Sequence, residues 1–374
     1  MIEAPGQSGR VWVFMGGGFG VHFRLPVSPE ILAEVSALDR FLGRWSTAQS
    51  VPAERLRLIE REARAHSAAA SCRIAGLQVS DADAWSLLEG RNTSITGAEE
   101  VLGYARALNR ELPPDGTLLG GDLLRALHAE MLGLGDSALS PWREGTLHRE
   151  GFDAEGRATG YVFSTLPARY AQQKTEELTT WLEIELRNRG QHPALVIGAF
   201  LLCFLSISPF ERANGRMSRL LAHLLLRRAG YGFLPYASLD SKMEASRHDY
   251  WDAVSRSQTH LWTEEADLEP WLSFFLGVLG RHRSDVEARI AAELRVQDFP
   301  PLQRAILEAV HEHGSVDAAL LIQETGANRN TLKDNLRRLV RGGVIEKIGE
   351  RRATRYRLPG AGRPGGPGVV GPKL

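Results

Sequence analysis

Residues 204–219 read Phe-Leu-Ser-Ile-Ser-Pro-Phe-Glu-Arg-Ala-Asn-Gly-Arg-Met-Ser-Arg, and this segment separates two apolar helical patterns, over residues 193–207 and 214–229. Pro209 is expected to end the first helix, because proline disfavours helical geometry in the residue before it. Asn214 is a favourable cap for the second helix. Residues 210–215 are therefore predicted to form a tight loop at the N-terminus of that helix.

This loop has the composition of an anion-binding site. Backbone N–H groups at a helix N-terminus attract negative charge, and Arg216 and Arg219 lie three residues apart on one face of the second helix. Guanidinium groups bind phosphate oxygens through charge-assisted hydrogen bonds, so a polyphosphate is the favoured ligand. The alternative is a capped helix that carries two solvated arginines and no ligand.

Helical periodicity covers most of the remaining chain. The expected helices are residues 31–41, 53–74, 82–89, 98–111, 123–131, 171–188, 243–258 and 268–281, beside the two named above. Before residue 285, strand-like patterns are limited to residues 10–25, around four glycines, and to residues 161–163 in a glycine-rich and charged segment. The predicted fold class is therefore mainly α, with a short β-hairpin.

A separate compositional unit follows a charged helix expected at residues 285–295. Three helices are predicted at residues 302–313, 316–325 and 328–341, and two strands within residues 344–358, an order typical of a winged helix-turn-helix. Residues 301–358 hold eleven Lys or Arg against seven Asp or Glu, a local excess of positive charge. The candidate DNA contacts on the third helix and the hairpin tip are Asn328, Arg329, Lys333, Arg337, Arg338, Arg351 and Arg352. The alternative is a unit that contacts proteins or forms a homodimer.

The overall composition excludes several classes of protein. With 374 residues, 43% hydrophobic, and 45 basic against 45 acidic side chains, the chain is expected to form two or three packed domains and carries no bulk charge for nucleic acid or membranes. No apolar run reaches the roughly 18 residues of a membrane span. The two cysteines, Cys72 and Cys203, are expected to be reduced and buried, with no metal site. A cytoplasmic protein with no membrane partner is predicted.

The loop resembles the motif of the Fic family, which runs His-Pro-Phe-x-Asp/Glu-Gly-Asn-Gly-Arg-x-x-Arg between two helices. The positions that match in register are Pro209, Phe210, Asn214, Gly215, Arg216 and Arg219. The resemblance extends roughly over residues 41–257, and a C-terminal winged helix is a common attachment in this family. It implies a Fic-type helical core at residues 111–285, preceded by an N-terminal strand and helical region at residues 1–110 that holds a degenerate inhibitory helix. The residue patterns add a linker helix at 286–300, a winged helix at 301–358 and, because proline and glycine dominate there, a disordered tail at 359–374.

The same resemblance implies an activity and its site. Fic proteins usually transfer the AMP moiety of ATP to a hydroxyl of a protein target, and nucleotide contacts are implied for Phe210, Arg212, Asn214, Gly215, Arg216 and Arg219. A flap that aligns the target is implied around His148, Tyr161, Val162 and Phe163. An inhibitory helix is implied at residues 71–76.

Three departures from the family pattern affect the chemistry. Ser208 stands where the family has the histidine that acts as general base, and loss of such a base typically costs about 10² to 10⁴ in rate. Arg212 stands where an acidic residue holds Mg²⁺, although Glu211 could substitute from a shifted loop. Ala213 replaces a glycine, so the backbone there has less access to left-handed conformations. Mg²⁺ binding is therefore in doubt.

The inhibitory segment is altered as well. It runs from Ser71 to Gly76, with Ala75 at the position of the glutamate that would pair with the last arginine of the motif. Arg219 is therefore expected to be free for phosphate. With Arg212 and Arg216, the loop would carry three positive charges opposed by Glu211 alone.

These departures favour a pseudo-enzyme or repurposed regulator that retains a nucleotide site. One alternative is an active AMP transferase with a different base, for which the candidates are His148, His192, His223 and His248, or with Ser208 as the nucleophile. Another is a DNA-binding transcriptional regulator whose Fic body senses a ligand.

Overall fold

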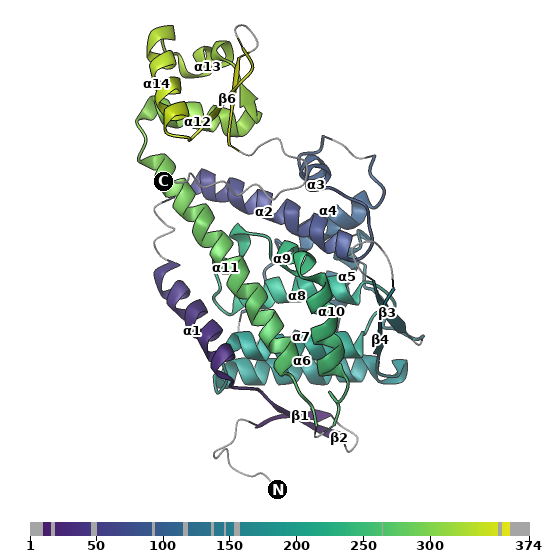
Figure 1. Ribbon diagram of the computed structural model, residues 1–374. Coiled ribbons are helices and arrows are strands. Elements are labelled where there is room, and N and C mark those ends of the chain that lie inside the picture. Colours follow the sequence, from purple (N-terminus) through teal and green to yellow (C-terminus); the bar gives the residue numbers. More distant parts are fainter. Residues whose placement is uncertain are drawn as a thin grey trace. The chain divides into compact units, whose positions relative to one another are not determined.

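The computed structural model describes residues 10–15, 19–45, 51–91, 94–114, 119–135, 138–145, 147–152, 158–263, 265–350 and 354–359. These residues are mainly helical (Figure 1) and divide into two compact units. Unit 1 comprises Met1–Thr47 and Leu56–Val286, and unit 2 comprises Ala48–Arg55 and Glu287–Leu374. The predicted mainly α fold class is confirmed.

The helices that belong wholly or largely to unit 1 follow the predicted pattern closely. They are α1 (Pro29–Arg44), α2 (Ala53–Ile74), α3 (Asp81–Leu88), α4 (Ala98–Ala107), α5 (Gly121–Met131), α6 (Ala171–Asn188), α7 (Pro193–Ile207), α8 (Asn214–Arg228), α9 (Leu239–Ala245), α10 (Arg247–Gln258) and α11 (Glu269–Gln297). The pattern differs from the prediction in two regions. The helix expected at residues 243–258 is divided at Ser246, which leaves helical geometry. The helices expected at 268–281 and 285–295 form the single helix α11, because residues 281–285 include no Gly or Pro to end it.

Helix α7 lies in the centre of unit 1 and packs against α6 and α8 (Figure 1). Thirteen of its fifteen residues are buried, so it is apolar on every side, as expected for a helix surrounded by others. Gly198 permits close approach to α11, since a Cβ there would lie 2.6 Å from Leu272 Cδ2. The indole of Trp271 donates a 2.7 Å hydrogen bond to the Gly198 carbonyl. Burial of α7 thus fixes the position of the loop that follows it.

Two antiparallel hairpins accompany the helices of unit 1. Strands β1 (Arg10–Met15) and β2 (Phe19–Arg24) pair with Val13 opposite Val21. Strands β3 (His148–Phe152) and β4 (Ala158–Ser164) pair with His148 opposite Ser164, and the register shifts between Glu150 and Phe152. The strand pattern at residues 161–163 lies within β4.

Unit 2 contains α12 (Pro301–His313), β5 (Ser315–Val316), α13 (Ala318–Thr325), α14 (Arg329–Arg341), β6 (Glu346–Ile348) and β7 (Arg355–Arg357). The three strands form an antiparallel sheet in the order β5-β7-β6. The helices enclose an apolar core that includes Ile306, Leu321 and Leu336. Arg55 also belongs to this unit, and its guanidinium donates to both carboxylate oxygens of Glu293, at 2.8 and 2.9 Å.

Two features bear on the expected class of protein. Within the described ranges, no helix has both the length and the apolar character needed to cross a bilayer. Cys72 and Cys203 are both buried and neither forms a disulfide. Burial raises the pKa of both thiols, so neither has the character of a reactive thiolate.

Candidate functional site

Ser208 ends α7 in the left-handed conformation, with φ of 48° and ψ of 69°. Its backbone N–H donates to the Phe204 carbonyl at 2.8 Å, and its hydroxyl donates to the Leu205 carbonyl at 2.7 Å. The residue is almost fully buried. The hydroxyl proton therefore satisfies a carbonyl at the end of the helix and is not directed to a base.

Asn214 closes the loop instead of capping α8, which corrects the predicted role. Its Oδ1 accepts from the Phe210 N–H at 3.0 Å, and its Nδ2 donates to the Phe210 carbonyl. The cap is Ala213, which takes φ of 60° although it is not glycine. A left-handed non-glycine residue costs about 1–2 kcal/mol. The loop thus retains the left-handed turn that the alanine was expected to impede.

The Phe210 ring is held between two other rings. His128 stacks on it with centroids 3.9 Å apart, and Trp142 lies on it at 5.5 Å. The His128 Nε2 lies 2.9 Å from the Arg212 carbonyl, and Nδ1 lies 2.7 Å from the Ser140 hydroxyl. Because a carbonyl only accepts, Nε2 carries the hydrogen and Nδ1 accepts from Ser140. Burial lowers the pKa of His128 to about 4, so the ring is neutral and both nitrogens are engaged.

Arg143 holds the end of α7, where the loop begins, through hydrogen bonds to backbone carbonyls. Its buried guanidinium donates to the carbonyls of Ile207 and Ser208 at 3.0 and 2.8 Å, and to those of Gly145 and Leu166 at 2.7 and 2.6 Å. These bonds join the end of α7 to the segments that lead into β3 and out of β4. Sequence patterns alone did not indicate Arg143 or His128, because neither belongs to a local pattern.

Arg219 is not free, contrary to the prediction. Its Nε donates to the Ser71 hydroxyl at 2.8 Å, another nitrogen donates to the Ser71 carbonyl at 2.9 Å, and Nε lies 3.4 Å from Asp240. Asp240 also accepts from Tyr104 at 2.9 Å and lies 2.7 Å from His223 Nε2. Burial alone would raise the pKa of Asp240, but His223, Arg219 and Tyr104 lower it below its usual value. Asp240 is therefore an ionised partner of Arg219.

Glu100 opposes the other two arginines of the loop. Its carboxylate forms ion pairs with Arg216 and, at 3.3 Å, with Arg212. Glu211, expected to be the one opposing acid, accepts from the backbone N–H groups of Glu144 and Gly145 at 2.7 and 3.0 Å. These two hydrogen bonds lower the pKa of Glu211. The expected balance of charge was wrong, since Glu100 and Asp240 oppose the arginines.

A cavity of about 280 Å³ lies beside the loop. The loop and α8 contribute to its wall Ser208, Arg212, Ala213, Gly215, Arg216 and Arg219. The end of α2 contributes Ile74 and Ala75, and α10 contributes Tyr250, Trp251, Val254 and Gln258. The Arg216 Nε is buried and has no hydrogen-bond partner among the described residues. Phe210 and Asn214 are buried and are not among the residues that line the cavity.

None of the candidate replacement bases whose side chains the structure describes, His192, His223 and His248, lines the cavity. No histidine is among the described residues that line the cavity. His192 precedes α7 and contacts Asp39, about 24 Å from Ser208 at 1.5 Å per helical residue. His223 is held by Asp240. The side chains of His148, Tyr161, Val162 and Phe163, predicted in the flap, lie outside the described residues.

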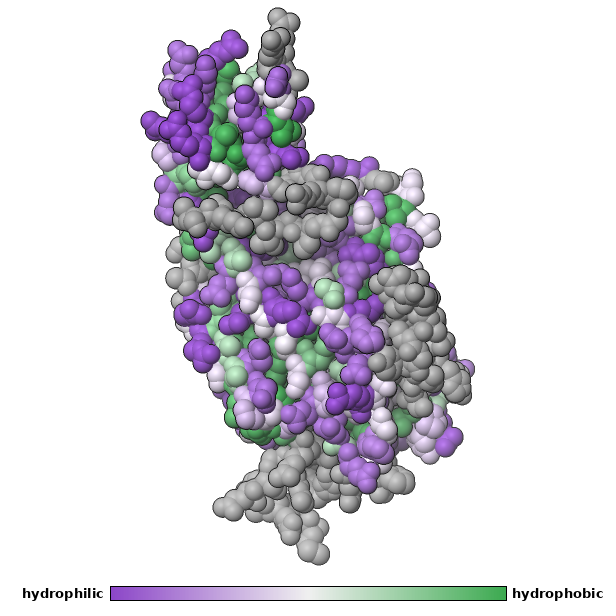
Figure 2. All heavy atoms as spheres, viewed as in Figure 1, coloured by the Kyte–Doolittle hydropathy of each residue, from purple (hydrophilic) through white to green (hydrophobic). Residues whose placement is uncertain are grey.

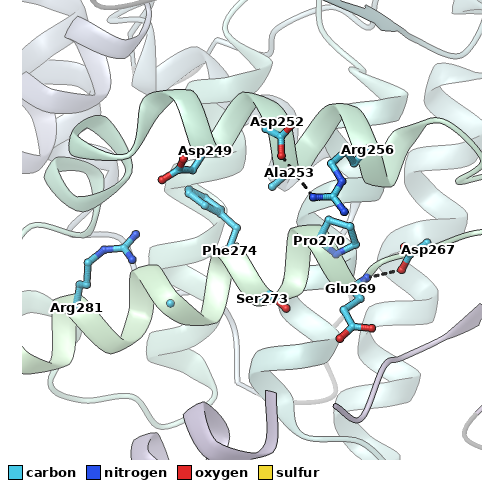
Figure 3. Close-up of a pocket in the computed structure, with 11 residues that line it drawn as sticks. Asp249, Asp252, Ala253, Arg256, Asp267, Glu269, Pro270, Ser273, Phe274 and Arg281 are labelled. Atoms are coloured by element: carbon cyan, nitrogen blue, oxygen red, sulfur yellow. Dashed lines mark hydrogen bonds and ion pairs between the residues drawn. The ribbon is translucent and has the colours of Figure 1, made fainter. Parts of the chain in front are cut away.

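A larger hollow, of about 590 Å³, lies between α10 and the first half of α11 (Figure 3). Its charged lining residues are mixed in sign: Asp249, Asp252, Asp267, Glu269, Arg256 and Arg281. Several already have partners, since Arg256 lies 3.6 Å from Asp252 and Arg281 donates to Ser246 at 3.0 Å. None of the predicted site residues whose side chains the structure describes lines this hollow. The cavity beside the loop is therefore the candidate site.

The candidate DNA-binding residues all belong to unit 2. Arg329, Lys333, Arg337 and Arg338 are exposed on α14, and Figure 2 shows hydrophilic residues gathered over this part of the chain. The Asn328 side-chain oxygen accepts from two backbone N–H groups, at 3.1 and 2.9 Å, and caps the helix. Arg351 and Arg352 lie outside the described residues.

The chain is similar in sequence and in fold to known Fic proteins. Residues 119–226, from just before α5 into α8, match the model of the Fic/DOC family. A Fic family protein from Desulfovibrio desulfuricans is 23% identical over 90% of this chain and 98% of its own, with a TM-score of 0.55. A Fic domain containing signaling protein from Bacteroides thetaiotaomicron is 18% identical over 70% of this chain and 97% of its own, with a TM-score of 0.54.

Fic-1 from C. elegans is 18% identical over 72% of this chain and 74% of its own, also with a TM-score of 0.54. No match was found among curated proteins. The chain therefore carries a Fic/DOC domain at residues 119–226 and has a Fic-type helical fold.

Proposed function

We propose that this Fic-type protein binds a nucleotide in the cavity beside the loop and acts as a regulator with little ordinary AMP transfer. The observation that carries the proposal is the buried Arg216 Nε, which has no partner among the described residues and lies in the wall of the cavity. A buried guanidinium N–H without an acceptor is costly, and a phosphate oxygen would satisfy it. Aromatic side chains of Tyr250 and Trp251 provide a surface on which a base can stack.

The chemistry around Ser208 supports a regulatory role over catalysis. The hydroxyl donates to Leu205, and no imidazole lines the described wall of the cavity. The residues present do not fit Mg²⁺ either. Arg212 is a cation, and the Glu211 carboxylate is bonded to the backbone of residues 144 and 145. Nucleotide binding that depends little on Mg²⁺ is therefore proposed.

Replacement of Arg216 tests the site. Arg216→Ala is expected to weaken ATP binding about 10- to 100-fold, because one charge-assisted hydrogen bond is worth about 1.5–3 kcal/mol. Isothermal titration calorimetry of the full chain, with and without Mg²⁺, measures this change. Arg256→Ala removes an exposed arginine of the hollow between α10 and α11 and should leave ATP affinity unchanged.

Two results would contradict the proposal. Absence of saturable ATP binding by the unchanged chain would exclude the nucleotide site. Efficient transfer of label from ATP labelled at the α-phosphate, by the unchanged chain to itself or to cell protein, would exclude the regulatory role and favour an AMP transferase with another base. Ser208→His combined with Arg212→Asp is the reference for restored transfer.

A second candidate function is DNA binding by unit 2. The order of helices and strands and the exposed basic side chains of α14 support a winged helix whose α14 enters the major groove. Replacing Arg337 and Arg338 by Ala should weaken binding to duplex DNA and reduce the slope of log affinity against log salt by about one for each phosphate that the arginines neutralise. Fluorescence anisotropy of the full chain at several salt concentrations measures both quantities.

The matched control for DNA binding is Arg304→Ala, because Arg304 lies on α12 and not on α14. It is expected to retain the salt slope of the unchanged chain. Binding that is absent, or that does not respond to salt, would indicate that unit 2 contacts proteins instead.

A further inference from the structure

The cationic wall of the cavity is paired with a carboxylate from outside the Fic/DOC domain. Glu100 lies in the first turn of α4, and its two oxygens reach Arg212 and Arg216. The Arg216 side chain is 5% exposed and that of Glu100 is 20% exposed, whereas Arg212 is 59% exposed. The Glu100–Arg216 ion pair is therefore the stronger of the two, because exposed ion pairs contribute little free energy.

We infer that Glu100 competes internally with the anion that the loop binds, so that a phosphate reaches Arg216 as the Glu100 carboxylate withdraws. This inference rests on the proposed function. A buried cation without a partner is strongly destabilised, so Arg216 requires an anion at all times. Exchange of the carboxylate for a phosphate keeps Arg216 paired. The affinity for the phosphate then depends on how much more strongly it pairs with Arg216 than the Glu100 carboxylate does.

The surroundings favour such an exchange. Glu100 leaves the Arg216 Nε without a partner among the described residues, whereas a phosphate presents several oxygens and can accept from more than one nitrogen of the guanidinium. Helix α4 begins after Gly97, which is left-handed and provides no side-chain cap. The first turn of α4 therefore lacks one common source of stability at the position from which Glu100 must move.

Glu100 is not at the position of the family's inhibitory glutamate, which Ala75 occupies in this chain. It comes from α4 and pairs with Arg216 and Arg212, whereas Arg219 is held by Ser71 and Asp240. Arg212, Arg216 and Arg219 thus all have partners, which come from α2, α4 and α9. The site is closed to anions by default, and Glu100 is the partner nearest to solvent.

Removal of the Glu100 charge tests the inference. In the full chain, Glu100→Gln is expected to bind ATP and inorganic pyrophosphate about tenfold more tightly than the unchanged chain in calorimetry. Without ligand its melting temperature should fall, because Arg216 is deprived of its partner, and pyrophosphate should raise it by more than in the unchanged chain. Glu99→Gln removes the neighbouring exposed charge of α4 and should change neither quantity.

Equal or weaker binding by Glu100→Gln, with binding by the unchanged chain intact, would overturn the inference and leave the proposed function standing. No binding of either probe by any variant would overturn both. If Glu100→Gln does not fold, Glu100→Asp shortens the side chain by one methylene and keeps its charge. It should then bind pyrophosphate more tightly than the unchanged chain, and equal affinity would count against competition.

Discussion

Arg143→Met is expected to lower the free energy of unfolding of unit 1 by about 4 kcal/mol, at roughly 1 kcal/mol for each hydrogen bond removed. The Arg143 guanidinium donates to the carbonyls of Gly145, Leu166, Ile207 and Ser208, and the side chain is 2% exposed. Methionine keeps the apolar stem and most of the volume but leaves these carbonyls without their donor. All eight tryptophans precede residue 272 and lie in unit 1, so tryptophan fluorescence during urea unfolding reports on this unit alone.

The same variant should also lose ATP binding, because the end of α7 and the start of the loop depend on Arg143. Arg143→Lys keeps the charge but cannot reproduce a planar fork of donors, so it should recover only part of the stability. Arg106→Met, on an exposed position of α4, is the control and should change stability by no more than about 0.5 kcal/mol. A loss below about 1 kcal/mol for Arg143→Met would show that the four carbonyls find other donors.

The fold of the loop region could be predicted because it depends on local patterns. The apolar run of α7, Pro209 after it and the periodicity of α8 each act within a few residues, and the structure ends and begins these helices where the patterns do. The sequence did not predict the division at Ser246, because serine has an intermediate helix propensity and does not mark a helix end by itself. The sequence also did not predict that α11 is continuous, because the charged residues between its two apolar stretches do not interrupt a helix.

The partners of the loop could not be predicted, because they are distant in sequence. Glu100, Arg143 and Asp240 reach the site from α4, from the segment before β3 and from α9. Each is a polar residue in an unremarkable local context, and only packing of the helices brings it to an arginine or a carbonyl. The expectation that Glu211 alone opposes the three arginines was therefore wrong, although Arg212, Arg216 and Arg219 all line one cavity.

Acidification from pH 6.5 to about pH 4.5 is expected to lower the stability of unit 1 by about 2 kcal/mol for each of two buried histidines, because a difference of one pKa unit between the folded and unfolded states corresponds to about 1.4 kcal/mol. Burial lowers the pKa of His128 and of His282 to about 4. Because these values lie below the unfolded value of about 6.5, the unfolded chain binds protons first as the pH falls. The stabilising contribution is thus complete above pH 6.5 and is lost towards pH 4.

His282 gives the sharper test of this acid sensitivity. Its Nε2 donates to the carbonyls of Leu234 and Ala237, both at 3.1 Å, and its Nδ1 is buried without a partner among the described residues. A proton on Nδ1 would therefore be a buried charge with no acceptor. His282→Gln retains an N–H donor but cannot titrate, so urea unfolding followed by tryptophan fluorescence should show about half the loss of stability between pH 6.5 and pH 4.5. The exposed His260→Gln should keep the full loss, and an unchanged pH dependence in His282→Gln would show that other groups govern unfolding in acid.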